Sequence, residues 1–163
     1  MIVRKLKIQN FRNFRTLDLE FSPKMTVIVG DNAVGKTSVI EAINCISSIK
    51  SFRTNEYQDL INDSSKYFYL EADLEEDLAS NKVTYYCDSN VKRLKLNNFV
   101  HSKLSDYVGF FNVICFSALD FLKLKGAGSE RRKMFDLIFC QISKDYLFMS
   151  NYYKKLLKDR NAL

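Results

Sequence analysis

The sequence has little proline, glycine, tryptophan and histidine. It contains one proline, five glycines, no tryptophan and one histidine among 163 residues. It has no internal repeat and no stretch rich in proline or glycine, which excludes a flexible low-complexity linker. We therefore expect one folding unit, or part of one.

The cysteine pattern indicates neither a zinc site nor a disulfide framework. Cys45, Cys87, Cys115 and Cys140 are far apart and form no Cys-x-x-Cys pair, and His101 is the single histidine. A structural zinc site needs closely spaced pairs of such ligands. We expect free thiols, which are typical of a reducing cytosol.

Long apolar runs are also missing. No run approaches the roughly 18 residues that a membrane-spanning helix needs. The N-terminus lacks the apolar core of a secretory signal. We therefore expect a cytoplasmic protein with no membrane partner.

The composition that is present fits a globular domain with a sizeable core, because 47% of the residues are hydrophobic and 27% are charged. The formal net charge is +6 and the isoelectric point is about 9.1. A basic balance favours polyanionic partners such as nucleic acid without proving one.

The strongest motif is a phosphate-binding loop. Residues 30–37 read GDNAVGKT and match G-x-x-x-x-G-K-[ST] at every fixed position. The apolar run at residues 25–29 predicts a buried strand before the loop, and apolar residues at helical spacing from Val39 to Ile49 predict a helix after it. Because strand, loop and helix follow in the order that the motif requires, we favour a nucleotide site over a chance Gly-Lys-Thr turn.

The chemistry of this loop suits a triphosphate. Gly30 and Gly35 allow a tight turn, so that successive N–H groups at a helix N-terminus face one anion. Lys36 would reach the outer phosphates of ATP, and the Thr37 hydroxyl would bind Mg²⁺. The expected cofactor-binding residues of the loop are Gly30, Asp31, Asn32, Ala33, Val34, Gly35, Lys36, Thr37 and Ser38.

Other elements follow from hydrophobic periodicity. Residues 1–9 and 16–22 predict two strands before the loop, and residues 67–77 predict a strand that ends in an acidic turn. Residues 82–88 and 91–96 predict a hairpin around Asp88-Ser89-Asn90.

The last third of the chain reads as mainly helical. We expect a short helix over residues 101–107, an apolar strand over residues 110–116, and helices after Gly128. There, Met134, Ile138 and Ile142 recur at a spacing of four.

Taken together, these residues resemble the N-terminal part of the RecF family, which are bacterial recombination and repair ATPases related to the ABC-type heads of chromosome-maintenance proteins. The resemblance is carried in order by Phe11-Arg12-Asn13-Phe14, the phosphate loop, Ser51-Phe52-Arg53, residues 116–136 and residues 153–161. The phosphate loop alone is unspecific. Its combination with Lys125-Gly126, Arg131-Arg132, Asp136 and the ending Leu157-Lys158-Asp159-Arg160-Asn161 is specific.

The resemblance implies an α/β fold. The chain would be a P-loop NTPase, the N-terminal lobe of an ABC-type head, with a mixed sheet and C-terminal helices from a helical second lobe. Residues 1–117 would form the N-terminal part of the ATPase lobe, and residues 118–163 the start of the helical lobe.

The resemblance also implies a function, namely ATP-dependent DNA binding in replication and recombinational repair, within the SOS response to DNA damage. The cofactors would be ATP and Mg²⁺, and Arg12 would help at the phosphates. The partners would be single- and double-stranded DNA, recombination mediator proteins and, in the full-length family, an ATP-dependent homodimer.

The sequence departs from the family in several places. Ala118, Leu119 and Gly128 stand where the family has Pro, an acidic residue and Pro. The chain also lacks the family's C-terminal half, with its signature loop and the apolar run that ends in the Mg²⁺-organising Asp (Walker B). We therefore expect a truncated form, an ATPase by family that binds ATP but hydrolyses it poorly alone.

Several basic residues are candidates for nucleic-acid contacts, although a solvated helix face explains the C-terminal run equally well. They are Arg53, Arg131, Arg132, Lys154, Lys155, Lys158 and Arg160. Arg131 and Arg132 fall in the first turn of a helix that Ser129 would cap, where the helix dipole disfavours cations. Either Glu130 or Asp136, or a phosphate of nucleic acid, would compensate.

Two other interpretations stay open. A mass of about 19 kDa suits a small P-loop phosphotransferase, but such kinases usually begin at the phosphate-loop strand and carry an Arg-rich lid. The other alternative is a degenerate, non-functional remnant of a longer gene.

Overall fold

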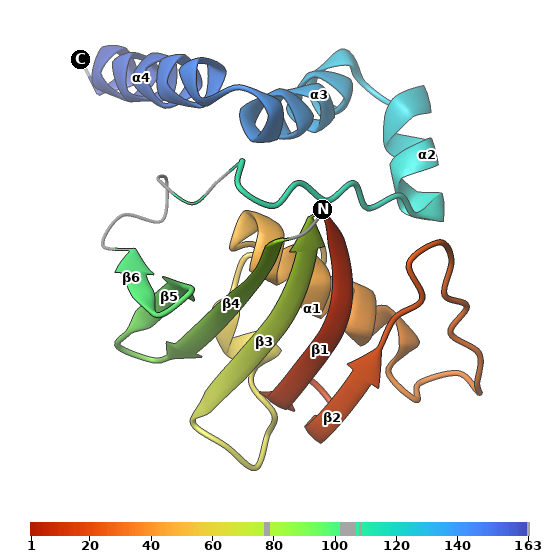
Figure 1. The fold of residues 1–163 in the computed structure, drawn as a ribbon. Coiled ribbons are helices and arrows are strands. Elements are labelled where there is room, and N and C mark those ends of the chain that lie inside the picture. The colour runs from red at the N-terminus through yellow and green to blue at the C-terminus, as the bar shows by residue number, and fades with distance from the viewer. Residues whose placement is uncertain (77–78, 102–106, 108, 163) are drawn as a thin grey trace. The chain divides into compact units, whose positions relative to one another are not determined.

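The computed structural model describes residues 1–76, 79–101, 107 and 109–162. The chain divides into two compact units, residues 1–107 and residues 108–163. Figure 1 shows the sheet and helix α1 in the first unit and three helices in the second. Most of the short helix predicted over residues 101–107 lies outside the described residues.

The first unit is built on a six-stranded sheet in which all neighbouring strands are antiparallel, in the order β2-β1-β3-β4-β5-β6. Its strands are β1 (Ile2–Phe11), β2 (Phe14–Glu20), β3 (Tyr67–Glu76), β4 (Ala79–Asp88), β5 (Lys92–Leu96) and β6 (Phe99–His101). The predicted strands at the N-terminus, the strand at residues 67–77 and the hairpin around residues 88–90 are therefore confirmed.

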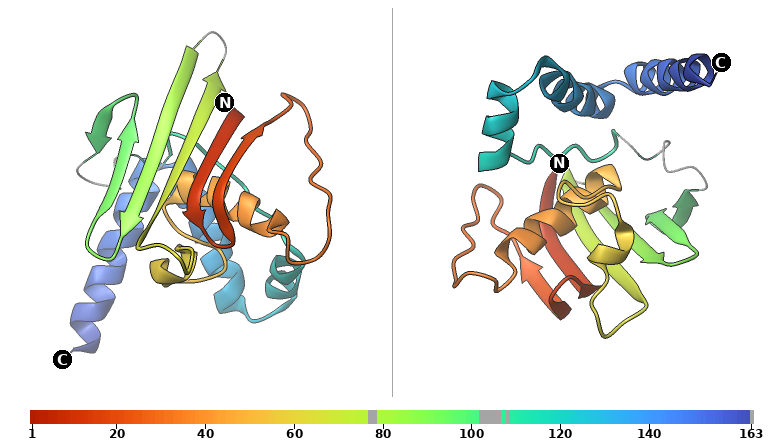
Figure 2. Two further views of the ribbon diagram at one scale, coloured as in Figure 1. Left: turned by 90° about the horizontal axis from the view of Figure 1, so that it is seen from below. Right: turned by 180° about the vertical axis from the view of Figure 1, so that it is seen from behind.

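Alternation along the strands separates a buried face from a solvated one, because successive side chains point to opposite faces. One cross-strand row, Ile8 with Leu70, Tyr85 and Leu94, is buried throughout. Helix α1 (Lys36–Ser48) covers this face and packs against β1, β3 and β4. Figure 2 shows α1 behind the sheet, with the segment that follows the helix on its other side.

Helix α1 is therefore enclosed from more than one direction, and this explains an unusual feature of its composition. Among the described residues, the buried polar side chains are all on α1, at every third position. They are Ser38, Glu41, Asn44 and Ser47. The 3-10 helix η1 (Tyr57–Leu60) lies in the segment between α1 and β3.

The buried strand predicted at residues 25–29 is wrong in this structure. The segment belongs to no strand, and Met25, Val27 and Val29 are 76%, 69% and 83% exposed. A strand needs a hydrogen-bonded neighbour. No described strand pairs with this segment.

The second unit contains α2 (Ala118–Lys125), α3 (Gly128–Ile142) and α4 (Lys144–Asn161). The prediction of helices after Gly128 is confirmed. The strand predicted at residues 110–116 is wrong, because the segment makes no ladder in the described structure and Ile114 and Phe116 are 77% and 63% exposed. α3 and α4 pack together, with the Phe139 and Tyr146 rings 5.5 Å apart.

The expected cap of α3 is also wrong. The cap position is Ala127, without a side-chain hydrogen bond, and Ser129 lies inside the first turn. Among the described residues, no helix is long and apolar enough to cross a membrane.

Candidate nucleotide-binding site

The phosphate loop connects residues 25–29, which belong to no strand, to α1. Its backbone takes left-handed or otherwise positive φ angles at Gly30 (152°), Ala33 (69°) and Gly35 (105°). Such angles cost little at glycine and are uncommon elsewhere. Residues 30–37 are exposed or half-exposed, whereas Ser38 is buried. The loop therefore lies open to solvent at the start of a buried helix.

The N-terminus of α1 is open to an anion. Gly35 is the cap residue and makes no side-chain hydrogen bond, and the first turn holds no acidic residue. The first N–H groups of a helix have no partner within the helix, and the dipole there favours negative charge. Thr37, the predicted Mg²⁺ ligand, is exposed in this first turn.

The side chain of Lys36 folds onto the loop that it belongs to. Its Nζ donates hydrogen bonds to the carbonyl oxygens of Gly30 at 2.7 Å and Asp31 at 2.6 Å. The ammonium group therefore spans the loop from its last residues to its first. This cation is therefore held against the loop, next to the helix N-terminus that would attract a phosphate group.

The turn between β1 and β2 lies against the loop. A Cβ atom added to Gly35 would overlap Cζ of Phe14 and would lie 2.8 Å from both amide atoms of Asn13. The φ angle of Gly35 therefore favours glycine, and any larger residue would also force the side chains of Asn13 and Phe14 to shift. The sequence motif predicts the glycine, but it does not predict which side chains fill the space.

Arg12, in the same turn, does not lie free beside the loop. Its Nε and Nη2 donate to the two carboxylate oxygens of Glu41, at 3.0 and 2.7 Å, and its Nη1 donates to the Asp59 carbonyl at 2.7 Å. The predicted phosphate contact of Arg12 therefore stays a prediction. In this structure its guanidinium joins the turn to α1 and η1.

Glu41 is the centre of this cluster, and its side chain is fully buried. Besides Arg12, it accepts hydrogen bonds from Ser51 Oγ at 2.5 Å and from Arg53 Nη1 at 3.1 Å. Burial raises the pKa of Glu41, but the hydrogen bonds from Arg12 and Ser51 and the charges of Arg12 and Arg53 outweigh it. The pKa of Glu41 therefore lies below its usual value.

Sequence reasoning missed Glu41. The available signal was the run of polar residues at every third position of α1. Because most of the other positions of this helix are apolar, the run indicates a polar stripe on a buried helix. Arg53 is an exposed partner of Glu41, and its predicted nucleic-acid contact stays a prediction.

The remaining predicted nucleic-acid residues belong to the second unit. Arg131 Nη1 donates to the Gly126 carbonyl at 3.0 Å, and its predicted contact with a nucleic-acid phosphate stays a prediction. Glu130 pairs with Lys133, and Asp136 accepts a hydrogen bond from the Tyr146 hydroxyl. Lys154, Lys155, Lys158 and Arg160 are exposed on α4, and Arg160 also bonds the Asn161 side chain.

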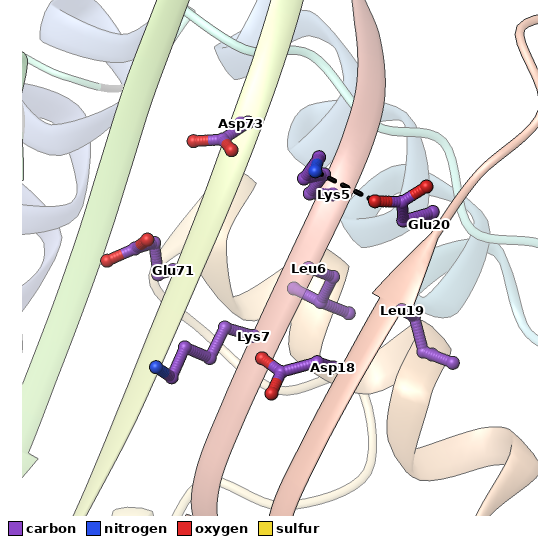
Figure 3. A pocket seen from close by; sticks show the side chains of 8 residues that line it. All are labelled: Lys5, Leu6, Lys7, Asp18, Leu19, Glu20, Glu71 and Asp73. Carbon is purple, nitrogen blue, oxygen red and sulfur yellow. Dashed lines mark ion pairs between the residues drawn. The ribbon is translucent and has the colours of Figure 1, made fainter.

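A depression of about 420 Å³ lies on the outer face of the sheet, and no phosphate-loop residue lines it. Figure 3 shows that its charged side chains come from β1, β2 and β3. Lys5 pairs with Glu20 at 2.7 Å, and Glu71 pairs with Lys82 of β4 at 2.8 Å. These cross-strand pairs explain the charges of this face as a solvated surface.

Comparison with known proteins shows which family the chain belongs to. Residues 2–107 match the RecF/RecN/SMC N-terminal domain. Over 163 residues the chain is 36% identical to the DNA replication and repair protein RecF of Exiguobacterium sp., and over 164 residues it is 38% identical to that of Alkaliphilus oremlandii. It spans 44% and 45% of these two proteins.

Solved structures agree. The "recombination mediator protein RecF-ATPrS in RecFOR pathway" superposes with a TM-score of 0.93 at 31% identity, over 99% of this chain and 44% of that one. The SMC head domain from Thermotoga maritima gives a TM-score of 0.58 at 26% identity, over 69% of this chain and 43% of that one. The predicted P-loop NTPase fold of an ABC-type head is confirmed. The chain thus belongs to the RecF/RecN/SMC family, and it resembles RecF along its whole length.

Proposed function

We propose that this chain binds ATP with Mg²⁺ at the phosphate loop, as the N-terminal half of a RecF-type ATPase that acts on DNA in replication and repair. The observation that carries the proposal is the open N-terminus of α1, preceded by a loop with positive φ angles and spanned by Lys36. Solved RecF relatives are described with ATP and ATPrS, which supports the nucleotide class.

Each loop residue has a role in this proposal. The backbone from Asn32 to Ser38 donates to phosphate oxygens, and Lys36 leaves the carbonyls of Gly30 and Asp31 to bind the outer phosphates. The Thr37 hydroxyl binds Mg²⁺, which keeps several waters and needs few protein ligands. The exposed position of Thr37 leaves room for those waters.

Hydrolysis needs more than this half supplies. A positioned water, an acidic group near the Mg²⁺ and charge stabilisation from a partner are the usual requirements. We infer that the apolar runs at residues 25–29 and 110–116 pair with strands that the rest of a RecF-type protein provides. The high exposure of Val29 and Ile114 supports this proposal. Without those strands the chain would bind ATP and turn it over poorly.

The DNA part of the proposal is supported by family membership and by the net charge of +6. In it, Arg53 and the basic residues of α3 and α4 contact the phosphate backbone, and the protein works in the cytoplasm with recombination mediator proteins. Contacts to the backbone predict binding that is independent of sequence and falls steeply with salt. Fluorescence anisotropy with one duplex at several salt concentrations measures this, and affinity that does not change with salt would exclude backbone contacts.

Calorimetric titration with Mg²⁺-ATP tests the nucleotide site. Lys36→Ala should lose detectable binding, because the phosphates lose the one cation inside the loop. Lys50→Ala is the matched control, since Lys50 is an exposed lysine just beyond the end of the same helix. Equal affinities for the original chain and Lys36→Ala would refute the proposed site. Loss in both variants would indicate a general effect of charge.

A further inference from the structure

The phosphate loop is in contact with a turn that is remote in sequence. Asn13 and Phe14 lie against Gly35, so closely that a Cβ atom at position 35 would force their side chains to shift. Gly35 is the residue whose backbone starts α1 and its row of N–H donors. The position of the turn therefore limits the conformations that the loop can adopt.

Arg12 anchors the turn to the segments around it. The backbone of Arg12 is left-handed, with a φ of 53°, which is uncommon for a residue with a side chain. Its N–H donates to the Leu60 carbonyl at 2.8 Å, and its carbonyl accepts from Asn62 Nδ2 at 2.6 Å. Its guanidinium adds the two bonds to Glu41.

Glu41 is the one charged anchor in this arrangement. Its carboxylate is fully buried and binds Arg12 through both oxygens, a geometry in which arginine and carboxylate are most strongly oriented. It stands on α1 little more than one turn after Lys36. The same helix therefore carries the N–H groups that would bind phosphate and the carboxylate that holds the turn against Gly35.

We propose that Glu41 is a positioning residue for nucleotide binding, which holds Arg12 so that Asn13 and Phe14 fix the phosphate loop at Gly35. This inference rests on the proposed function. Glu41 itself does not touch the nucleotide. Its effect passes through Arg12 and the turn to the backbone of the loop.

If Arg12 instead bound the terminal phosphate directly, Glu41→Gln would change the ATP affinity in the opposite direction. If Glu41 only restrained Arg12 from the terminal phosphate, Glu41→Gln would free a guanidinium and strengthen ATP binding. If Glu41 positions the loop, Glu41→Gln weakens ATP and ADP by the same factor, about tenfold for a coupling of typical size. Calorimetry with both nucleotides separates the two roles, and stronger ATP binding would overturn the proposal.

The control is Ser51→Ala, which removes another hydrogen bond to the same carboxylate without touching the turn. It also removes the hydrogen bonds that Ser51 Oγ accepts from the backbone N–H groups of Arg53 and Thr54. We expect its nucleotide affinities to stay within about twofold of the original chain. Phe14→Leu is the second test variant, because it removes the ring from Gly35 and leaves the ion pair intact. It should weaken ATP and ADP equally even if Glu41→Gln does not fold, and unchanged affinities in Phe14→Leu would overturn the proposal.

A measurement without nucleotide keeps this inference separate from the proposed function. The edge of the Phe14 ring faces Gly35, so the α-proton resonances of Gly35 in the NMR spectrum report the contact. In Glu41→Gln they should move toward their positions in Phe14→Leu, and in Ser51→Ala they should stay. Unmoved Gly35 resonances in folded Glu41→Gln would overturn the link. If the original chain binds no ATP, the proposed function fails and the spectrum still decides whether Glu41 fixes the loop.

Discussion

The two sides of the phosphate loop are built very differently. After the loop, α1 is buried, carries a polar stripe and is joined through Glu41 to the β1–β2 turn and to the segment that follows the helix. Before the loop, residues 25–29 belong to no strand and expose most of their apolar side chains. The loop is thus supported by buried contacts at α1, here called the helix side, and not at residues 25–29, here called the strand side.

This difference shows which interactions are local to this half of the family's chain. The helix side uses contacts of α1 with β1, β3 and β4 and the bonds of Glu41, all of which lie within the described chain. The strand side has the right residues but no neighbour among the described strands, and a lone strand cannot satisfy its backbone. In the proposed function, anion binding at the helix N-terminus depends mainly on the helix side.

The largest effect is expected from breaking the helix side. Glu41→Ala leaves the buried side of Arg12 without its counter-charge, and removal of one partner of a buried pair typically costs about 3–5 kcal/mol. Urea unfolding followed by circular dichroism measures the loss. Glu20→Ala is the control, because the Lys5–Glu20 pair is exposed and its loss should leave the midpoint unchanged. Similar midpoints for both variants would show that the buried cluster contributes little to the fold.

A smaller effect is expected when one apolar residue on each side of the loop is truncated and the losses of unfolding free energy are compared. Leu70 is fully buried beneath α1, and Leu70→Ala should cost about 2–5 kcal/mol of unfolding free energy. Val29 is 83% exposed, and Val29→Ala should change the unfolding free energy by less than about 0.5 kcal/mol. Both values come from the same urea titrations. A cost at Val29 close to that at Leu70 would mean that the strand side is buried in solution, and the contrast would fail.

The sequence predicts the helix side of this site better than the strand side, and the reasons are physical. The motif at residues 30–37 and the helix after it depend on local spacing, which a sequence displays directly. The run at residues 25–29 has strand preference, but pairing depends on a neighbour that spacing does not reveal.

The cluster around Glu41 escaped prediction for another reason. Arg12, Glu41 and Arg53 are separated by 29 and 12 positions in the sequence, and nothing local indicates that their charges meet. Acidic residues on a helix are usually solvated, so the polar stripe of α1 resembles an exposed face until the segment after the helix is placed over it. The fold was therefore predictable from motif and family resemblance, whereas the support of the loop was not.

The smallest expected effect is a dependence on pH that belongs to the helix side alone. The pKa of Glu41 is lowered in the folded chain. A lowered folded pKa means that the carboxylate stabilises the fold above its ordinary value of 4.5, and that this contribution is lost as the pH falls through the lower folded value. Glu41→Gln cannot titrate, so the difference in unfolding free energy between the original chain and this variant should shrink as the pH is lowered from 6 toward 3. Urea titrations at several pH values measure it. Residues 25–30 hold no titratable side chain, so Val29→Ala should keep the same small difference at every pH. A constant difference for Glu41→Gln as well would mean that folding does not shift the pKa of Glu41.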